Sequence, residues 1–175
     1  DIARLAAEPR PIPVFMQMSD SMPEAKRARI RANIVDTIWE VNRGPRLSRR
    51  FFMDLAGTGM CAAALYFNDQ SEYAQIMRLD PRMCYPDVRN GALVSMVYVE
   101  SVKVDVAEHQ WPELKGKLKR EGGKNADCTL AIYYDEDEVA PAVLQQIGKT
   151  QANGYVVDRW EHGLGCVPVA FQTLD

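Results

Sequence analysis

The period of the apolar residues changes once along this chain, at Gly59, and that change limits the folds open to it. Before Gly59 the apolar residues recur every three or four positions, as they do along one side of a helix. After it, short apolar runs follow one another without the regular strand–helix alternation of a parallel sheet. The sequence therefore predicts an α+β fold: two N-terminal helices packed on a mostly antiparallel sheet, with short intervening helices. Residues 1–58 would form the helical segment and residues 59–175 the sheet region.

Two amphipathic helices are predicted ahead of Gly59. The first begins at Ser21 and Glu24, which have the spacing of a capping box, and it ends before Gly44. The second begins there, with Pro45 in its first turn. The helical spacing predicts that five apolar residues are buried between the helices and the sheet: Ile30, Ile34, Ile38, Phe51 and Leu55. Truncating Ile34 to Ala would then cost about 2–5 kcal/mol of stability.

The sheet region is predicted from compact or alternating apolar runs that are bounded by turn residues. The expected strands are 61–67, 74–79, 93–101, 102–106, 128–135, 154–163 and 167–172. A short helix with Pro112 in its first turn and a longer helix over residues 139–148 are expected between them. The acidic run 135–138 would then precede the longer helix, where the helix dipole favours negative charge.

Composition excludes several classes of protein. Hydrophobic residues make up 47% and charged residues 26%, which is typical of a globular domain and excludes a disordered or coiled-coil chain. No apolar run approaches the roughly 18 residues of a membrane-spanning helix. The chain starts without a methionine and without a secretory leader, and this start suggests a piece of a longer chain.

The residue types that carry catalysis or bind metals do not combine into a site in this sequence. His162 and Cys166 are four apart and could form a thiol–imidazole pair, but the glycines between them indicate a turn before an apolar strand. The four cysteines, at 61, 84, 128 and 166, lack the spacing of zinc or redox motifs, and we expect them to be reduced. The basic residues from 115 to 124 are expected on a solvated helix face. No enzymatic activity, metal or cofactor is predicted.

Three stretches occur in an order found in a known family. RANIVDTIWEVNRG is followed by RRFFMDLAGTGMCAAALYF, a helix that enters an apolar strand through glycines. Next comes RLDPRMCYPDVRNGALVSMVYVES, with Asp80-Pro81 and Tyr85-Pro86-Asp87 ahead of Gly91 and an alternating strand. The last is VVDRWEHGLGCVPVAFQ, with a His-x-x-Gly turn. This order resembles the pre-stem wing region of tailed-bacteriophage portal proteins, over nearly all of the chain.

The resemblance implies a structural, non-enzymatic subunit of the virion. Portal proteins form a ring, expected to be twelve-fold, at one capsid vertex, and they are assembled in the host cytoplasm. The terminase drives genomic DNA through the ring during packaging, and DNA leaves by the same route. The implied partners are further copies of the chain, the major capsid protein, the terminase large subunit and the neck or adaptor protein, with no membrane. A portal would continue past Asp175 into a stem.

Charge suggests how such a ring would be held. The net charge of −3 combines +4 over residues 1–50 with −7 over residues 51–175, which suits head-to-tail packing of neighbours. The positive face is expected on the first helix, largely off its apolar stripe, and its candidate interface residues are Lys26, Arg27, Arg29 and Arg31. Two alternatives stay open at this point: a stand-alone head–tail adaptor or binding domain, and a hydrolase that uses Cys166 and His162.

Overall fold

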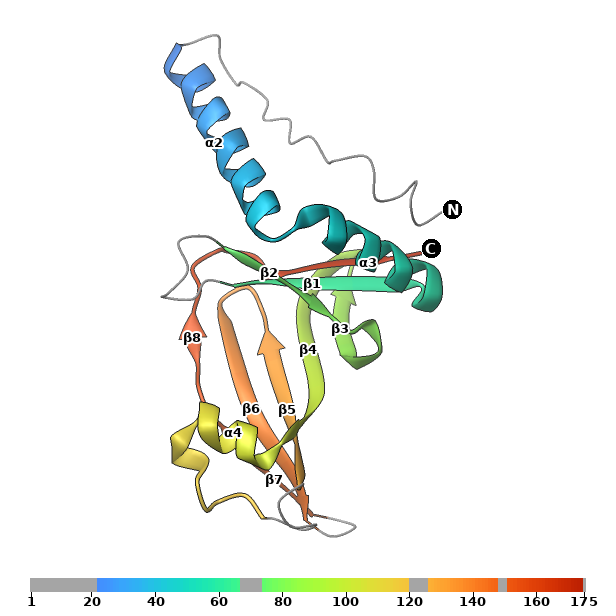
Figure 1. Cartoon of the computed structure of the whole chain (residues 1–175), viewed down its shortest axis with the longest axis vertical. Helices are drawn as coiled ribbons and strands as arrows, with labels where there is room; N and C mark the ends of the chain where they lie inside the picture. Colours follow the sequence, from blue (N-terminus) through green and yellow to red (C-terminus); the bar gives the residue numbers. More distant parts are fainter. Residues whose placement is uncertain (1–21, 67–73, 120–125, 148–150, 175) are drawn as a thin grey trace. The chain divides into compact units, whose positions relative to one another are not determined.

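The computed structural model describes residues 22–66, 74–119, 126–147 and 151–174, and it confirms the α+β class with a mostly antiparallel sheet (Figure 1). The chain divides into two compact units. Unit 1 runs to Pro81 and takes in Phe171 and the residues that follow, and unit 2 is Arg82–Ala170. The expected division into segments 1–58 and 59–175 stays a prediction.

Unit 1 combines two helices with a three-stranded sheet in the order β2-β1-β9. Its elements are α2 (Met22–Val41), α3 (Gly44–Thr58), β1 (Met60–Tyr66), β2 (Gln75–Leu79) and β9 (Val169–Thr173). The hairpin of β1 and β2 confirms the strands expected at 61–67 and 74–79. The strand expected at 167–172 is also present, as β9.

Helix α3 lies along β1, and local backbone geometry sets both of its ends (Figure 1). Arg43 adopts a left-handed conformation with φ 54°, which breaks the helical path between α2 and α3. Gly59 ends α3 with φ 76° and donates its backbone N–H to the Leu55 carbonyl at 2.9 Å. A glycine suits this position because a Cβ is disfavoured at positive φ. The predicted helix stop is therefore confirmed, and β1 starts at the next residue.

The Asn42 side chain joins the end of α2 to the edge of β2. Its amide nitrogen donates to the carbonyl oxygens of Ile38, at 2.8 Å, and Ala74, at 2.9 Å. Its amide oxygen accepts the backbone N–H of Ile76 at 2.8 Å. The donor and acceptor thus pair with β2 as a neighbouring strand would. Beside this joint, a Cβ on Gly44 would overlap the Trp39 indole at 1.9 Å, so only glycine allows that contact.

The burial expected along α2 is wrong for its first half. Ile30 is 48% exposed and Ile34 is 52% exposed, whereas Ile38, Phe51 and Leu55 are partly buried. The helix extends away from the sheet of unit 1, and its last residues make the joint (Figure 1). Helical spacing identifies which side of a helix is apolar, but it does not supply a surface to cover that side. Truncating Ile34 is therefore not expected to create the core cavity assumed above.

Unit 2 is an antiparallel sheet in the order β3-β4-β5-β6-β7, with the short strand β8 also paired to β6. Its strands are β3 (Cys84–Arg89), β4 (Ala92–Lys103), β5 (Asp127–Tyr134), β6 (Glu138–Ile147), β7 (Gln151–Val156) and β8 (Trp160–Glu161). The strands expected at 93–101 and 128–135 are confirmed. β3 was not expected, although the Asn90-Gly91 turn that joins it to β4 was. Both turn residues have positive φ, as a tight hairpin requires.

One face of this sheet is covered by α4 (Val104–Gln110) and by the segment that follows it. This segment starts with a short 3₁₀ helix, η2 (Pro112–Leu114). Another 3₁₀ helix, η1 (Pro81–Met83), precedes β3. The buried cluster beneath this cover consists of Val104, Ala107, Leu114, Leu118, Ala126, Cys128, Leu130 and Val143. Gln145, itself buried, accepts the Lys119 N–H at 2.6 Å and donates to the Lys119 carbonyl. This amide holds the end of the covering segment on β6.

Two helix and strand assignments from the sequence are wrong. Residues 139–148 were expected to be helical, but they form β6, in which Val139, Pro141, Val143 and Gln145 are buried in alternation. The local sequence does not exclude the helix, because Pro141 would fall in its first turn; pairing with β5 on one side and β7 on the other selects the strand. Residues 104–106 were expected to extend a strand, but they open α4. Val104 and Ala107 are three apart and both enter the buried cluster, so burial overrides the local alternation.

Two further expectations are corrected in detail. The strand expected at 154–163 is interrupted, since β7 ends at Val156 and β8 holds only Trp160 and Glu161. The short helix expected around Pro112 is a single 3₁₀ turn, and the helix of this region, α4, ends before that proline.

We predict that Asn42→Ala destabilises the chain by about 1–3 kcal/mol, because it leaves the Ile76 N–H and the Ala74 carbonyl without their partner. Urea unfolding monitored by circular dichroism measures the loss. Thr37→Ala is the matched control, since the Thr37 hydroxyl bonds only within its own helix, to the Asn33 carbonyl at 2.8 Å. Equal stability of the two variants would contradict the role given to Asn42.

Candidate functional site

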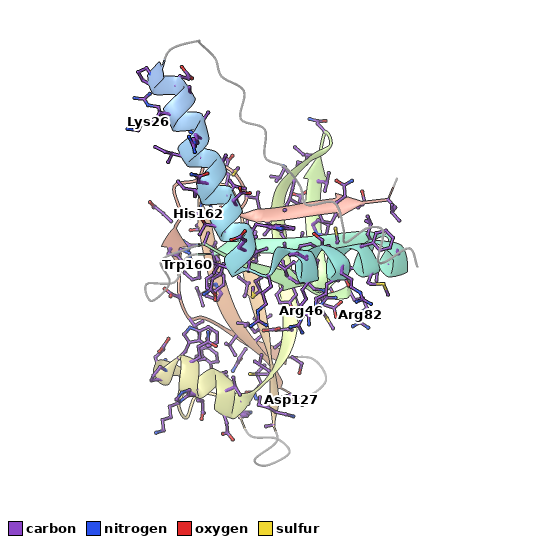
Figure 2. All side chains as sticks on the ribbon, turned by 45° about the horizontal axis from the view of Figure 1, so that its top comes forward. Lys26, Arg46, Arg82, Asp127, Trp160 and His162 are labelled. Atoms are coloured by element: carbon purple, nitrogen blue, oxygen red, sulfur yellow. The ribbon has the colours of Figure 1, made fainter. Side chains whose placement is uncertain are left out.

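The expected interface residues all lie on α2 and are exposed: Lys26, Arg27, Arg29 and Arg31. Lys26 is close to the N-terminal end of the helix (Figure 2). Their placement differs from the expectation in one respect. Lys26 and Arg27 precede Ile30 by about one turn, so they extend the apolar stripe, whereas Arg29 and Arg31 flank it. Positive charge and exposed apolar surface thus share one side of α2.

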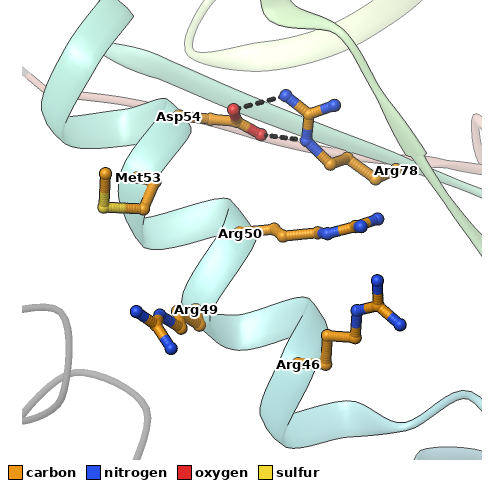
Figure 3. A pocket seen from close by; sticks show the side chains of 6 residues that line it. All are labelled: Arg46, Arg49, Arg50, Met53, Asp54 and Arg78. Carbon is orange, nitrogen blue, oxygen red and sulfur yellow. Dashed lines mark hydrogen bonds and ion pairs between the residues drawn. The ribbon is translucent and has the colours of Figure 1, made fainter.

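A second positive surface, missed in the sequence, lies on α3. An open pocket of about 640 Å³ is lined by Arg46, Arg49, Arg50, Met53, Asp54 and Arg78. Arg46, Arg50 and Arg78 extend to the same side of the helix, as the close view shows (Figure 3). The signal was present in the sequence, where three arginines occur within five residues. We name this site the arginine pocket.

Among the described residues that line the pocket, one carries a carboxylate, Asp54, and it is already paired. Arg78 on β2 donates from Nε to Asp54 Oδ2 and from Nη2 to Asp54 Oδ1, both at 2.5 Å (Figure 3). A bidentate pair of this kind is directional and stronger than a single contact. Because Arg78 neutralises Asp54, the charges of Arg46, Arg49 and Arg50 are left without an ion pair to any residue that the structure describes. The pocket is therefore a net cationic site on a rigid helix.

The acidic run at 135–138 forms the turn between β5 and β6, so its expected place at a helix start is wrong. Asp135 donates its backbone N–H to the Glu138 carbonyl at 3.1 Å. Its carboxylate accepts the N–H groups of Asp137, at 2.9 Å, and Glu138, at 2.7 Å. These two hydrogen bonds are the main reason that the pKa of Asp135 is lowered. We name residues 135–138 the acidic hairpin; Glu136 and Asp137 are its exposed tip.

His162 forms hydrogen bonds with the backbone of this turn. Its Nε2 lies 3.0 Å from the Asp135 carbonyl oxygen, and its Nδ1 accepts the Leu164 N–H at 3.2 Å. With Nδ1 accepting the Leu164 N–H, Nε2 is the ring nitrogen placed to donate to the Asp135 carbonyl oxygen. The His162 backbone N–H also donates to the Asp137 carbonyl at 3.1 Å. Since both ring nitrogens bond the backbone, His162 orders the turn and is not free to activate Cys166.

The thiols show no reactive arrangement in the described chain. None of the four cysteines, all within the described residues, forms a disulfide; Cys84 and Cys128 are buried and Cys61 is half-buried. Burial raises the pKa of Cys61 and of Cys128, so both favour the protonated, unreactive thiol. Cys166 was expected to fill an apolar strand, but it is exposed and lies ahead of β9. Its surroundings are set by the glycine turn and not by a core.

The remaining candidates from the sequence are the basic residues after Pro112, a metal site and a membrane-spanning helix. The lysines at 115, 117 and 119 are exposed as expected, but they lie on turns after η2 and not on a helix. Within the described ranges, no three or more metal-ligating side chains gather into a group. Over the same residues, no helix has the length and apolar character needed to cross a membrane.

Comparison with known proteins adds no relative: no family model matches the chain, and a search of curated proteins finds no significant match.

We predict that Asp135 contributes pH-dependent stability. Its pKa is lowered in the folded chain, so its contribution is complete above the ordinary value of 3.8 and is lost as pH falls through the lowered folded value. Asp135→Asn keeps an acceptor oxygen but removes the charge. Urea midpoints from pH 7 to pH 2.5 should fall further for the wild type than for Asp135→Asn, with the difference confined to pH values below about 4. Parallel pH profiles would contradict this assignment.

Proposed function

We propose that this chain is a structural subunit of a phage portal ring, the assembly at a capsid vertex through which DNA is packaged and ejected and to which the neck and tail attach. The order of motifs given above supports the portal identity. The proposed partners come from the same resemblance: other copies of the chain in a twelve-fold ring, the major capsid protein, the terminase large subunit, the neck or adaptor protein and the passing genomic DNA. The proposed location is the virion, after assembly in the host cytoplasm.

One observation carries the proposal of an assembly subunit: the apolar stripe of α2 is exposed. Ile30, Ile34 and Val41 are each about half exposed, and they recur on one side of a 20-residue helix. Single exposed apolar residues are ordinary on protein surfaces, but a continuous stripe is characteristic of a surface that another chain covers. A helix with such a stripe is a common way to dock into an apolar groove.

The charges of the two units favour a head-to-tail contact. Within the described residues, unit 1 has nine Lys/Arg against five Asp/Glu, net +4, and unit 2 has seven against twelve, net −5. Like patches would repel in a two-fold dimer that paired the same surface on both copies. Unlike surfaces on one chain instead favour a heterologous contact, and such contacts close into rings.

The adaptor alternative is distinguished by its oligomeric state, since a stand-alone binding domain would remain a monomer. The hydrolase alternative receives no support from the arrangement around His162, because both of its ring nitrogens bond backbone groups.

We predict that Ile30→Asp combined with Ile34→Asp abolishes ring assembly while the subunit stays folded. Burying the exposed half of each side chain would contribute about 1 kcal/mol per contact, and the introduced carboxylates would oppose burial altogether. Because both residues are half exposed in the single chain, its own stability should change by less than about 1 kcal/mol. Native mass spectrometry and negative-stain electron microscopy measure assembly, and urea unfolding measures stability.

The matched control is Ala25→Asp combined with Ala32→Asp, which places the same two charges almost opposite the stripe on the same helix. It should assemble as the wild type does. A wild-type chain that stays monomeric at every concentration would overturn the ring proposal. Assembly of the Ile30→Asp, Ile34→Asp variant to the same extent as the wild type would show that the stripe is not an interface.

The basic residues of α2 should orient neighbours more than they bind them, because exposed charges are screened over about 8–10 Å at ordinary salt. We predict that Arg27→Glu combined with Arg31→Glu slows ring formation several-fold at low salt and less at high salt, with the subunit still folded. Light scattering at two ionic strengths measures the rates. Equal rates for variant and wild type at both ionic strengths would show that these residues do not face a partner.

A further inference from the structure

The arginine pocket and the acidic hairpin each carry charges that are not used within the part of the chain described. Arg46, Arg49 and Arg50 lack an ion pair there because Arg78 takes up Asp54. At the hairpin, Glu138 pairs with Arg159 at 3.0 Å, and the Asp135 carboxylate accepts two backbone N–H groups. Two complementary surfaces are thus left open, one in each unit.

The occupant of a cationic pocket could be a nucleic-acid backbone or an acidic protein segment, and charge favours the second. The chain has a net charge of −3, and unit 2 alone carries −5 over its described residues, so a polyanion is repelled by most of the molecule. A nucleic-acid-binding domain is usually strongly basic overall. A second copy of this chain instead offers its negative unit to the positive one.

The acidic hairpin presents two charges at a narrow turn. Its loop is two residues long, and its two residues, Glu136 and Asp137, are both exposed at the end of β5 and β6. The turn is held by the Asp135 carboxylate and by His162, whose backbone N–H bonds the Asp137 carbonyl. A preorganised tip loses little conformational entropy when it binds.

The spacing of the two surfaces is compatible. Arg46 and Arg50 lie one turn apart on α3, which separates their Cα atoms by about 6 Å along the helix axis, and both extend to the same side (Figure 3). The Cα atoms of Glu136 and Asp137 are about 3.8 Å apart, as in any trans-linked pair. Long arginine side chains can close the difference, and a guanidinium group can hold a carboxylate by two parallel hydrogen bonds.

We propose that the arginine pocket of one copy receives the acidic hairpin tip of the next copy, with Arg46 and Arg50 binding Glu136 and Asp137. This contact rests on the proposed ring and names one of its interfaces. It is heterologous, since the pocket and the hairpin belong to different units of the same chain, so it propagates from copy to copy until the ring closes. The apolar stripe of α2 supplies burial elsewhere, and the pocket sets register and orientation.

Charge exchange tests the contact. The pocket variant carries Arg46→Glu with Arg50→Glu, and the hairpin variant carries Glu136→Lys with Asp137→Lys. Each variant alone places like charges at every interface, and we expect the concentration at half-assembly to rise about tenfold or more. In an equimolar mixture the two variants can alternate around the ring with unlike charges at every interface. The mixture should therefore assemble within about threefold of the wild-type concentration.

A third chain with all four substitutions separates a contact between copies from one within a copy. Rescue by both the mixture and the fourfold variant supports the proposal. Rescue by the fourfold variant without rescue by the mixture would show a contact inside one chain and would overturn it. Single-site controls are Arg43→Glu and Glu113→Lys, each of which reverses one charge at an exposed position outside the pocket and the hairpin.

The remaining outcomes separate this inference from the ring itself. If both double variants assemble as the wild type does, the pocket contact is wrong while the ring stands. If the wild type never assembles, the ring proposal fails with it. A fluorescent 20-base-pair DNA duplex is titrated in parallel. Loss of duplex binding in the pocket variant, with assembly unchanged, would assign the pocket to nucleic acid and overturn the proposed contact. Circular dichroism melts verify that every variant is folded.

Discussion

In both units, a side-chain amide holds a helical or irregular segment against a sheet. The amide forms hydrogen bonds with backbone groups in the way that a neighbouring strand does. Asn42 does this for the end of α2 at the edge of β2, and Gln145 does it for Lys119 above β6. A carboxamide carries a donor and an acceptor about as far apart as those of a peptide group, so it satisfies an N–H and a carbonyl at once. Asn42 thus adds to the connection of α2 with α3 and to the contact of Trp39 with Gly44.

That joint explains why α2 is available for assembly. Its last residues are held, while its first half, with the exposed Ile30 and Ile34, lies beyond them. In unit 2 the Asp135 carboxylate and His162 form hydrogen bonds that order the acidic hairpin, and its exposed charges lie on this ordered turn. The arginine pocket is likewise built on a helix, α3, which is anchored by the buried Leu47. The backbone of each proposed contact surface is therefore part of a helix or of a hydrogen-bonded hairpin turn.

The errors of the sequence interpretation share one physical origin. Residues 139–148 contain apolar residues at both helical and strand spacing, and the pairing of β6 with β5 and β7 selects the strand. Residues 104–106 alternate as a strand does, yet α4 forms because Val104 and Ala107 reach the buried cluster together. A local pattern states which residues can share a face, but the partner surface decides which face is used. The same limit applies to α2, whose stripe was correctly identified and wrongly assigned to the core.

The sequence by itself determined the class of fold, the change from helices to strands at Gly59, the separation of α2 from α3 and the Asn90-Gly91 hairpin. These features rest on backbone restrictions of glycine, proline and asparagine that act over a few residues and need no partner. Only the tertiary structure brought together Asp54 and Arg78, which are 24 residues apart, and thereby left three arginines of the pocket uncompensated. Only the pairing of β8 with β6 placed His162 against the acidic hairpin. Such contacts depend on how segments that are distant in the sequence pack together, and short-range sequence patterns do not determine the free energy of that packing.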